Sequence, residues 1–101
     1  MKFLKEVEIS DDLINWIEGT FSDVDIKYLN DNKENLISSI NYLRSINVNL
    51  EIIESIFELD YSILIPGGDA LKKAVSKLDE KEFVSKLNDD IDYVDYLHNI
   101  Y

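Results

Sequence analysis

The fold is decided by residues 32–57, which read NKENLISSINYLRSINVNLEIIESIF. Apolar residues recur there at steps of three and four, as they do on one face of a helix. The first stripe holds Leu36, Ile37, Ile40, Leu43 and Ile46, and the second holds Ile52, Ile53, Ile56 and Phe57. Asn32 and Asn49 are suitable N-caps, and Asn47 can end the first helix because asparagine tolerates positive φ. The stretch predicts two helices whose short connection makes an antiparallel hairpin.

The segments before this hairpin carry weaker signals. Residues 3–9 alternate, with Phe3, Val7 and Ile9 on one side, which predicts a short, half-buried strand. Ser10 is a suitable N-cap for a helix over residues 11–18, which Gly19 would end. A short turn over residues 20–32 is expected to begin at Thr20 or Ser22.

After the hairpin, the strongest break in the chain is Pro66-Gly67-Gly68, which predicts a turn. Asp69 is then expected to cap one helix, and Asp79 to cap another that ends near Asn88. The last stretch has Ile91, Val94, Leu97 and Ile100 at helical steps. Residues 62–65 are either a turn of helix or a strand that pairs with residues 3–9 in a minor two-stranded ribbon.

Together these segments predict a mainly α fold, a compact bundle of five to six short helices built on helical hairpins. Its 101 residues fit a single small domain, with the Pro66-Gly67-Gly68 turn as the one point of sub-division. Leu36, Ile40 and Leu43 match Leu71, Val75 and Leu78 at a constant offset, so an internal duplication is an alternative origin of the helices.

The composition excludes several classes of function. With 21 acidic and 10 basic residues, the formal net charge is −11, which disfavours sequence-independent binding to nucleic acid. No cysteine is present, so disulfides and thiolate metal sites are excluded. No apolar run is long enough for a membrane span, and the charged start is unlike a secretory signal. We therefore expect a cytoplasmic protein.

The charges are unevenly distributed. Lys72, Lys73, Lys77, Lys81 and Lys86 form a small basic patch, whereas acidic residues dominate the rest of the chain. Carboxylates beside tyrosines could dock a basic partner, because opposite charge selects partners and aromatic rings supply affinity. The alternative is a charged face that keeps the protein soluble. The candidate partner-binding residues are Asp89, Asp90, Asp92, Tyr93, Asp95 and Tyr96.

Motifs for metal binding or catalysis are incomplete. Asp23, Asp25, Asp31 and Glu34 have the spacing of a calcium loop, but Lys27 and Tyr28 occupy positions that need an oxygen ligand and a glycine. His98 is the only histidine, and Asp95 lies three residues before it. The sequence therefore predicts no catalytic residue, no metal site, no cofactor and no enzymatic activity.

Two segments are similar to known families. The predicted order of strand, helix, loop and helix over residues 5–46, with Val7-Glu8-Ile9-Ser10 at its start, resembles ribbon-helix-helix repressors. That resemblance implies a dimer whose strand reads DNA, although the outward residues here are Glu6 and Glu8. Residues 36–64 resemble one repeat of the mitochondrial transcription termination factors, which bind nucleic acid through basic surfaces.

The expected function is that of an acidic, non-enzymatic protein-interaction module. In its most concrete form it is an inhibitor or immunity-type protein, bacterial or phage-like, that covers the basic surface of another protein. A DNA-associated regulator with the ribbon-helix-helix order is one alternative. An oligomeric structural domain is another, since Trp16 and the isoleucines exceed what a small core readily hides.

Overall fold

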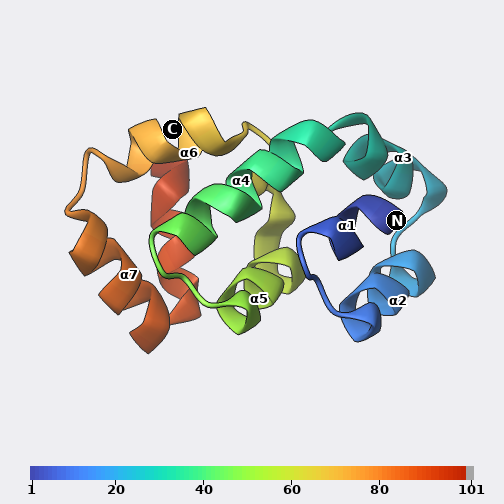
Figure 1. Cartoon of the computed structure of the whole chain (residues 1–101), viewed down its shortest axis with the longest axis horizontal. Coiled ribbons are helices and arrows are strands. Elements are labelled where there is room, and N and C mark those ends of the chain that lie inside the picture. The colour runs from blue at the N-terminus through green and yellow to red at the C-terminus, as the bar shows by residue number, and fades with distance from the viewer. Residues whose placement is uncertain (100–101) are drawn as a thin grey trace.

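The computed structural model describes residues 1–99, which are mainly helical and contain no strand. They form a body of 36 × 22 × 21 Å with α4 at its centre, α2 and α3 toward one end, and α7 at the other (Figure 1). Within this range no helix has the length and hydropathy needed to cross a membrane. The elements are α1 (Lys2–Glu6), α2 (Asp11–Thr20), α3 (Asp23–Asp31), α4 (Lys33–Ser45), α5 (Leu50–Asp60), α6 (Gly68–Val75), α7 (Glu80–Asp89) and two 3₁₀ helices, η1 (Tyr61–Leu64) and η2 (Ile91–Asn99).

Several predicted helix starts are confirmed, but Gly19 does not end α2, which continues to Thr20, and the segment predicted as a short turn contains α3. The side chains of Ser10, Ser22, Asn49 and Asp79 each accept a hydrogen bond from the backbone N–H three residues later. Asn47 adopts a φ of 72°, as expected for the residue that ends α4. These predictions succeed because a cap depends only on its own turn of the chain.

Two predicted caps are wrong. Asn32 precedes α4, but its side chain makes no capping bond: its amide nitrogen donates to the Tyr28 carbonyl of α3, and its φ of −109° and ψ of 20° differ from the extended backbone usual at an N-cap. Asp69 does not begin α6, which starts one residue earlier at Gly68. Gly68 is buried, and its N–H donates to the Ser38 hydroxyl of α4, so a contact distant in sequence replaces the local cap.

The predicted two-stranded ribbon is also wrong. Residues 2–6 are α1, because Phe3, Leu4 and Val7 have helical spacing and all three are buried, whereas an alternating strand would place Leu4 on the side opposite to Phe3 and Val7. Glu8 then turns the chain with a φ of 67°, and the N–H of Ile9 donates to the Leu4 carbonyl. The second proposed strand is η1, so the resemblance to ribbon-helix-helix repressors fails at its first element.

The turn before α6 is held against α4 by two neighbouring serines. Ser39 is fully buried and its hydroxyl donates to the Leu64 carbonyl at 2.7 Å. Ser38 accepts from the N–H of Gly68 at 3.0 Å. Gly67 has a φ of 100°, which confirms the predicted turn. As a result α4 makes its most extensive contact with α6, although α5 also packs on it.

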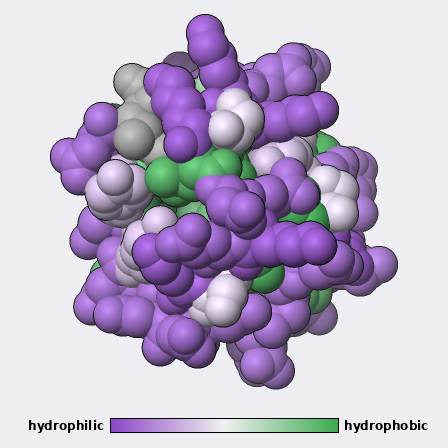
Figure 2. Space-filling model, turned by 90° about the vertical axis from the view of Figure 1, so that its left-hand side faces the viewer, coloured by the Kyte–Doolittle hydropathy of each residue, from purple (hydrophilic) through white to green (hydrophobic). Residues whose placement is uncertain are grey.

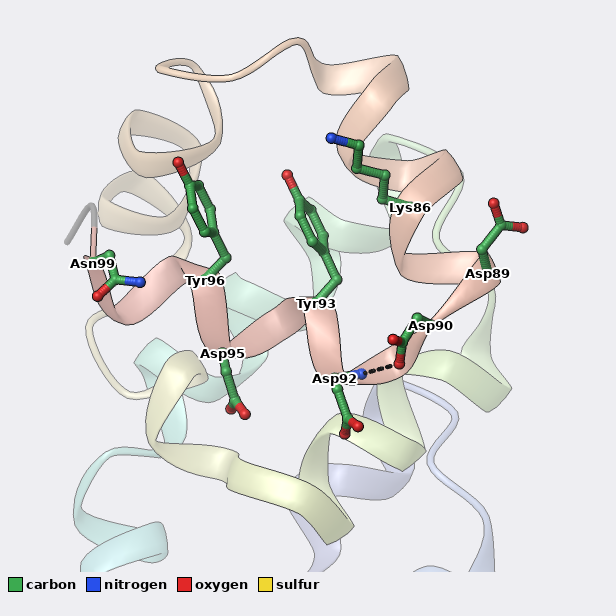
Figure 3. A pocket seen from close by; sticks show the side chains of 8 residues that line it. All are labelled: Lys86, Asp89, Asp90, Asp92, Tyr93, Asp95, Tyr96 and Asn99. Atoms are coloured by element: carbon green, nitrogen blue, oxygen red, sulfur yellow. Dashed lines mark hydrogen bonds between the residues drawn. The ribbon is translucent and has the colours of Figure 1, made fainter.

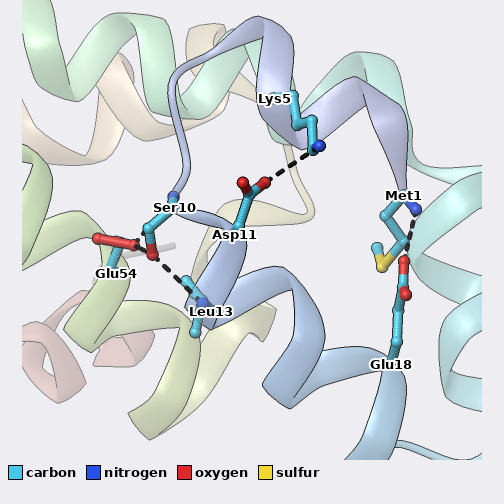
Figure 4. A network of polar contacts seen from close by, with 7 residues as sticks. All are labelled: Met1, Lys5, Ser10, Asp11, Leu13, Glu18 and Glu54. Carbon is cyan, nitrogen blue, oxygen red and sulfur yellow. Dashed lines mark hydrogen bonds and ion pairs between the residues drawn. The ribbon is translucent and has the colours of Figure 1, made fainter.

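Polar contacts also join the N-terminal helices to the rest of the protein (Figure 4). The hydroxyl of Ser10 donates to Glu54 on α5, and the backbone N–H of Ser10 donates to the same carboxylate at 3.2 Å. Lys5 forms an ion pair with Asp11 at 3.1 Å. The bonds to Glu54 connect the start of α2 to α5, and the ion pair connects α1 to α2.

Candidate functional site

The candidate site is built on η2, which packs against α7, α5 and η1. A 3₁₀ helix has three residues per turn, so side chains at i and i+3 lie directly above one another. A 3₁₀ run of nine residues is long, and η2 is held in this form by the core beneath it. Val94 and Leu97 are buried, and Ile91 packs partly buried beside them. The predicted burial of Ile100 lies outside the described residues.

This geometry places the exposed residues of η2 in two further rows. One row holds Tyr93 and Tyr96, and the other holds Asp92, Asp95 and His98. Figure 3 shows the two tyrosine rings side by side, with the carboxylates of Asp92 and Asp95 on the opposite side of η2. The tyrosines and these two aspartates therefore occupy different rows and point to opposite sides of η2, so they do not form a single face of this helix.

The two tyrosines form a stacked pair. Their ring centroids lie 5.7 Å apart and the ring planes differ by only 6°. Tyr93 is half-buried and contacts Phe83 of α7, with the centroids 6.0 Å apart, whereas Tyr96 is 44% exposed. The core thus fixes one ring, and that ring orients its exposed neighbour.

Lys86 of α7 lies over the ring of Tyr93. Its ammonium nitrogen is 5.4 Å from the centroid of Tyr93, within the range of a cation–π contact. The same nitrogen forms an ion pair with Glu82 at 2.7 Å. The hydrogen bond and the charge of Glu82 raise the pKa of Lys86 above its usual value. The tyrosine surface therefore already accommodates one cation from its own chain.

A surface hollow of about 520 Å³ runs along η2 and the end of α7, and we call it the tyrosine groove. It contains all six residues that the sequence predicted for partner binding, together with Lys86 and Asn99. The lining residues are Lys86, Asp89, Asp90, Asp92, Tyr93, Asp95, Tyr96 and Asn99. Figure 2 shows that the α7 end of the molecule is mostly hydrophilic, with small hydrophobic areas between the polar side chains.

Asp90 shapes the connection between α7 and η2. Its carboxylate accepts from the N–H of Asp92 at 3.0 Å, and its carbonyl accepts from the N–H of Tyr93 at 3.1 Å. Asp90 thus acts as a turn-forming residue, while Asp89 projects from the last turn of α7 (Figure 3). Sequence reasoning did not separate these two roles, and it assigned Lys86 only to the basic patch.

His98 has a different principal partner from the one that its spacing suggested. Its Nε2 lies 2.6 Å from Oδ2 of Asp60, at the end of α5. Partial burial alone would raise the pKa of Asp60, but hydrogen bonds from Ser62 and His98 outweigh it and hold the pKa below its usual value. This pair links segments 38 residues apart, so no local pattern could have indicated it.

The calcium-loop spacing does not form a loop. Residues 23–31 are α3 and α4 begins at Lys33, so the four acidic side chains are spread along helices. Asp25 accepts from the Ser22 hydroxyl, and Asp31 pairs with Lys27. The regular backbone cannot wrap carbonyl and carboxylate oxygens around one ion as a calcium loop does.

A second exposed region surrounds Trp16, which is 41% exposed and contacts Phe21 edge-on. Phe21 in turn packs on Tyr61. Glu51, Glu54 and Glu58 of α5 line the hollow beside Trp16. The oligomeric alternative rests on this region and stays a prediction.

Comparisons with protein-family models, curated proteins and solved structures find no match for this chain.

Proposed function

We propose that this chain is a non-enzymatic binding module whose tyrosine groove docks a basic segment of another protein. The observation that carries the proposal is one surface hollow along η2 and the end of α7, where a stacked tyrosine pair and four aspartates line the same space. In its most concrete form, the module is an inhibitor or immunity-type protein. It would cover a basic surface on its target, with its carboxylates in the positions that phosphates would otherwise occupy.

The chemistry of the groove favours arginine as the contacting residue. A guanidinium group stacks on an aromatic face and forms two hydrogen bonds with one carboxylate. Tyr96 offers an exposed ring, while Lys86 already covers Tyr93. Asp89 at the end of α7 and Asp92 in the first turn of η2 line the same groove. The net charge of −11 would attract a cationic partner from a distance.

The proposal is tested by titrating the isotope-labelled chain with a short peptide of alternating arginine and glycine, called here the arginine peptide. We expect the amide resonances of residues 86–99 to shift most, because the peptide would lie along η2. The affinity should fall as salt is added, since salt screens exposed charges. A peptide of alternating glutamate and glycine is the control and should cause no shift.

Two results would contradict the proposal. The shifts could be spread evenly over the acidic surface, which would indicate diffuse charge attraction. They could also concentrate on α2 and α5 around Trp16, which would assign docking to that region.

The alternative function, a DNA-associated regulator, depended on an N-terminal strand, and residues 2–6 form the helix α1 instead. We therefore expect no binding of duplex DNA at low salt.

A further inference from the structure

Three side chains that could bind a metal ion converge on the carboxylate side of η2. They are Asp60, Asp95 and His98, and one ligand atom of each lies within 4.8 Å of the others. Asp95 and His98 are neighbours in the same row of η2, whereas Asp60 comes from the end of α5. The sequence predicted no metal site because it showed only one histidine, and the contribution of Asp60 arises from the fold.

The Asp60 carboxylate is oriented before any ligand arrives. Its Oδ1 accepts hydrogen bonds from the N–H of Ser62 at 3.0 Å and from the Ser62 hydroxyl at 2.5 Å. Its Oδ2 is thereby turned toward Nε2 of His98, 2.6 Å away. Partners of this kind that orient a ligand commonly increase the affinity of metal sites in proteins.

We propose that Asp60, Asp95 and His98 bind a divalent first-row transition metal ion of the Zn²⁺ class. One imidazole nitrogen and two carboxylate oxygens suit such ions, whereas Mg²⁺ and Ca²⁺ prefer oxygen ligands alone. The ion replaces the proton shared by His98 and Asp60. Asp95 is exposed, so its side chain can rotate to bring its oxygen within bonding distance. Water completes the coordination, as at open zinc sites.

This site shares Asp95 with the tyrosine groove, whereas Asp60 and His98 lie outside the groove lining. The bound ion would connect the end of α5 to η2 and would offset the repulsion between the two carboxylates. It would therefore stabilise the folded chain, because the unfolded chain does not hold the three ligands together.

Titration of the full chain with Zn²⁺ tests the proposal, with binding followed by calorimetry and by the ring resonances of His98. Because His98 is the only histidine, a shift of its ring signal reports binding at this site directly. We expect one ion per chain and a higher unfolding temperature with Zn²⁺. His98→Asn and Asp95→Asn should each weaken binding by at least about tenfold.

Glu58→Gln is the matched control. It removes one carboxylate from α5 close to Asp60 and changes the net charge by the same amount as Asp95→Asn. We expect Zn²⁺ affinity to stay within about twofold, since nearby surface charge contributes little at physiological salt. Equal losses in Glu58→Gln and Asp95→Asn would overturn the proposal, as would unchanged His98 resonances or no detectable binding by the folded chain.

Discussion

Gly68→Ala is expected to lower the free energy of unfolding by about 2–3 kcal/mol, because it overpacks the contact between α4 and α6. A Cβ at Gly68 would lie 2.4 Å from the Ser38 hydroxyl oxygen and 2.6 Å from the Ser38 carbonyl oxygen. The hydroxyl can rotate, but the carbonyl belongs to the backbone of the central helix. We expect the midpoint of thermal unfolding to fall by about 10 °C or more, measured by circular dichroism.

Gly19→Ala is the matched control for this prediction. Gly19 lies in α2, and no heavy atom is within 4 Å of the position that its Cβ would take. Alanine is favoured over glycine inside a helix by about 1 kcal/mol, so this variant should be as stable as the original chain or slightly more so. An unchanged free energy of unfolding in Gly68→Ala would contradict the close packing of α6 on α4.

Asp89→Lys combined with Asp92→Lys is expected to weaken binding of the arginine peptide by about 100-fold, because two charge-assisted contacts become repulsions. Asp89 ends α7 and Asp92 lies in the first turn of η2, on the two elements that line the tyrosine groove. Dissociation constants measured at an ionic strength of about 0.15 M test this. At that ionic strength, charges farther away than about 8 Å are largely screened.

The control pair is Glu6→Lys with Glu34→Lys. Glu6 ends α1 and Glu34 lies in the first turn of α4, so both substitutions match their counterparts in charge and in helix position. Figure 1 shows α1 and the start of α4 far from α7. We expect less than about a threefold loss of affinity in the control pair. Equal losses in both pairs would mean that total charge, and not the groove, determines binding.

The parts of the fold that the sequence predicted correctly are those with local causes. Ser10, Asn49 and Asp79 cap helices through atoms three residues away, and Asn47 ends α4 through its own φ. The predicted strand over residues 3–9 was wrong because such a short segment satisfies both helical and alternating spacing. Residues 1–99 contain no partner strand that would favour the extended form.

The sequence named six of the residues that line the candidate site, but it did not predict how their side chains are arranged. The sequence named Asp92, Tyr93, Asp95 and Tyr96 as candidates, but their separation into two rows follows from the 3₁₀ form of η2. The apolar residues at 91, 94 and 97 repeat every three positions, which is the signal that could have indicated this form. The pairing of His98 with Asp60 depends on how η2 packs against α5 and η1, and no sequence period encodes that.

The most direct test of the central claim compares the dissociation constants of the arginine peptide for Tyr96→Ala and Tyr28→Ala. Tyr96 is 44% exposed on η2 and Tyr28 is 47% exposed on α3, and neither change alters the net charge of −11. We predict that Tyr96→Ala weakens binding by roughly five- to tenfold, through loss of the cation–π contact, and that Tyr28→Ala has no effect. Equal effects of the two substitutions, or an unchanged affinity in Tyr96→Ala, would contradict a binding site built on the stacked tyrosines.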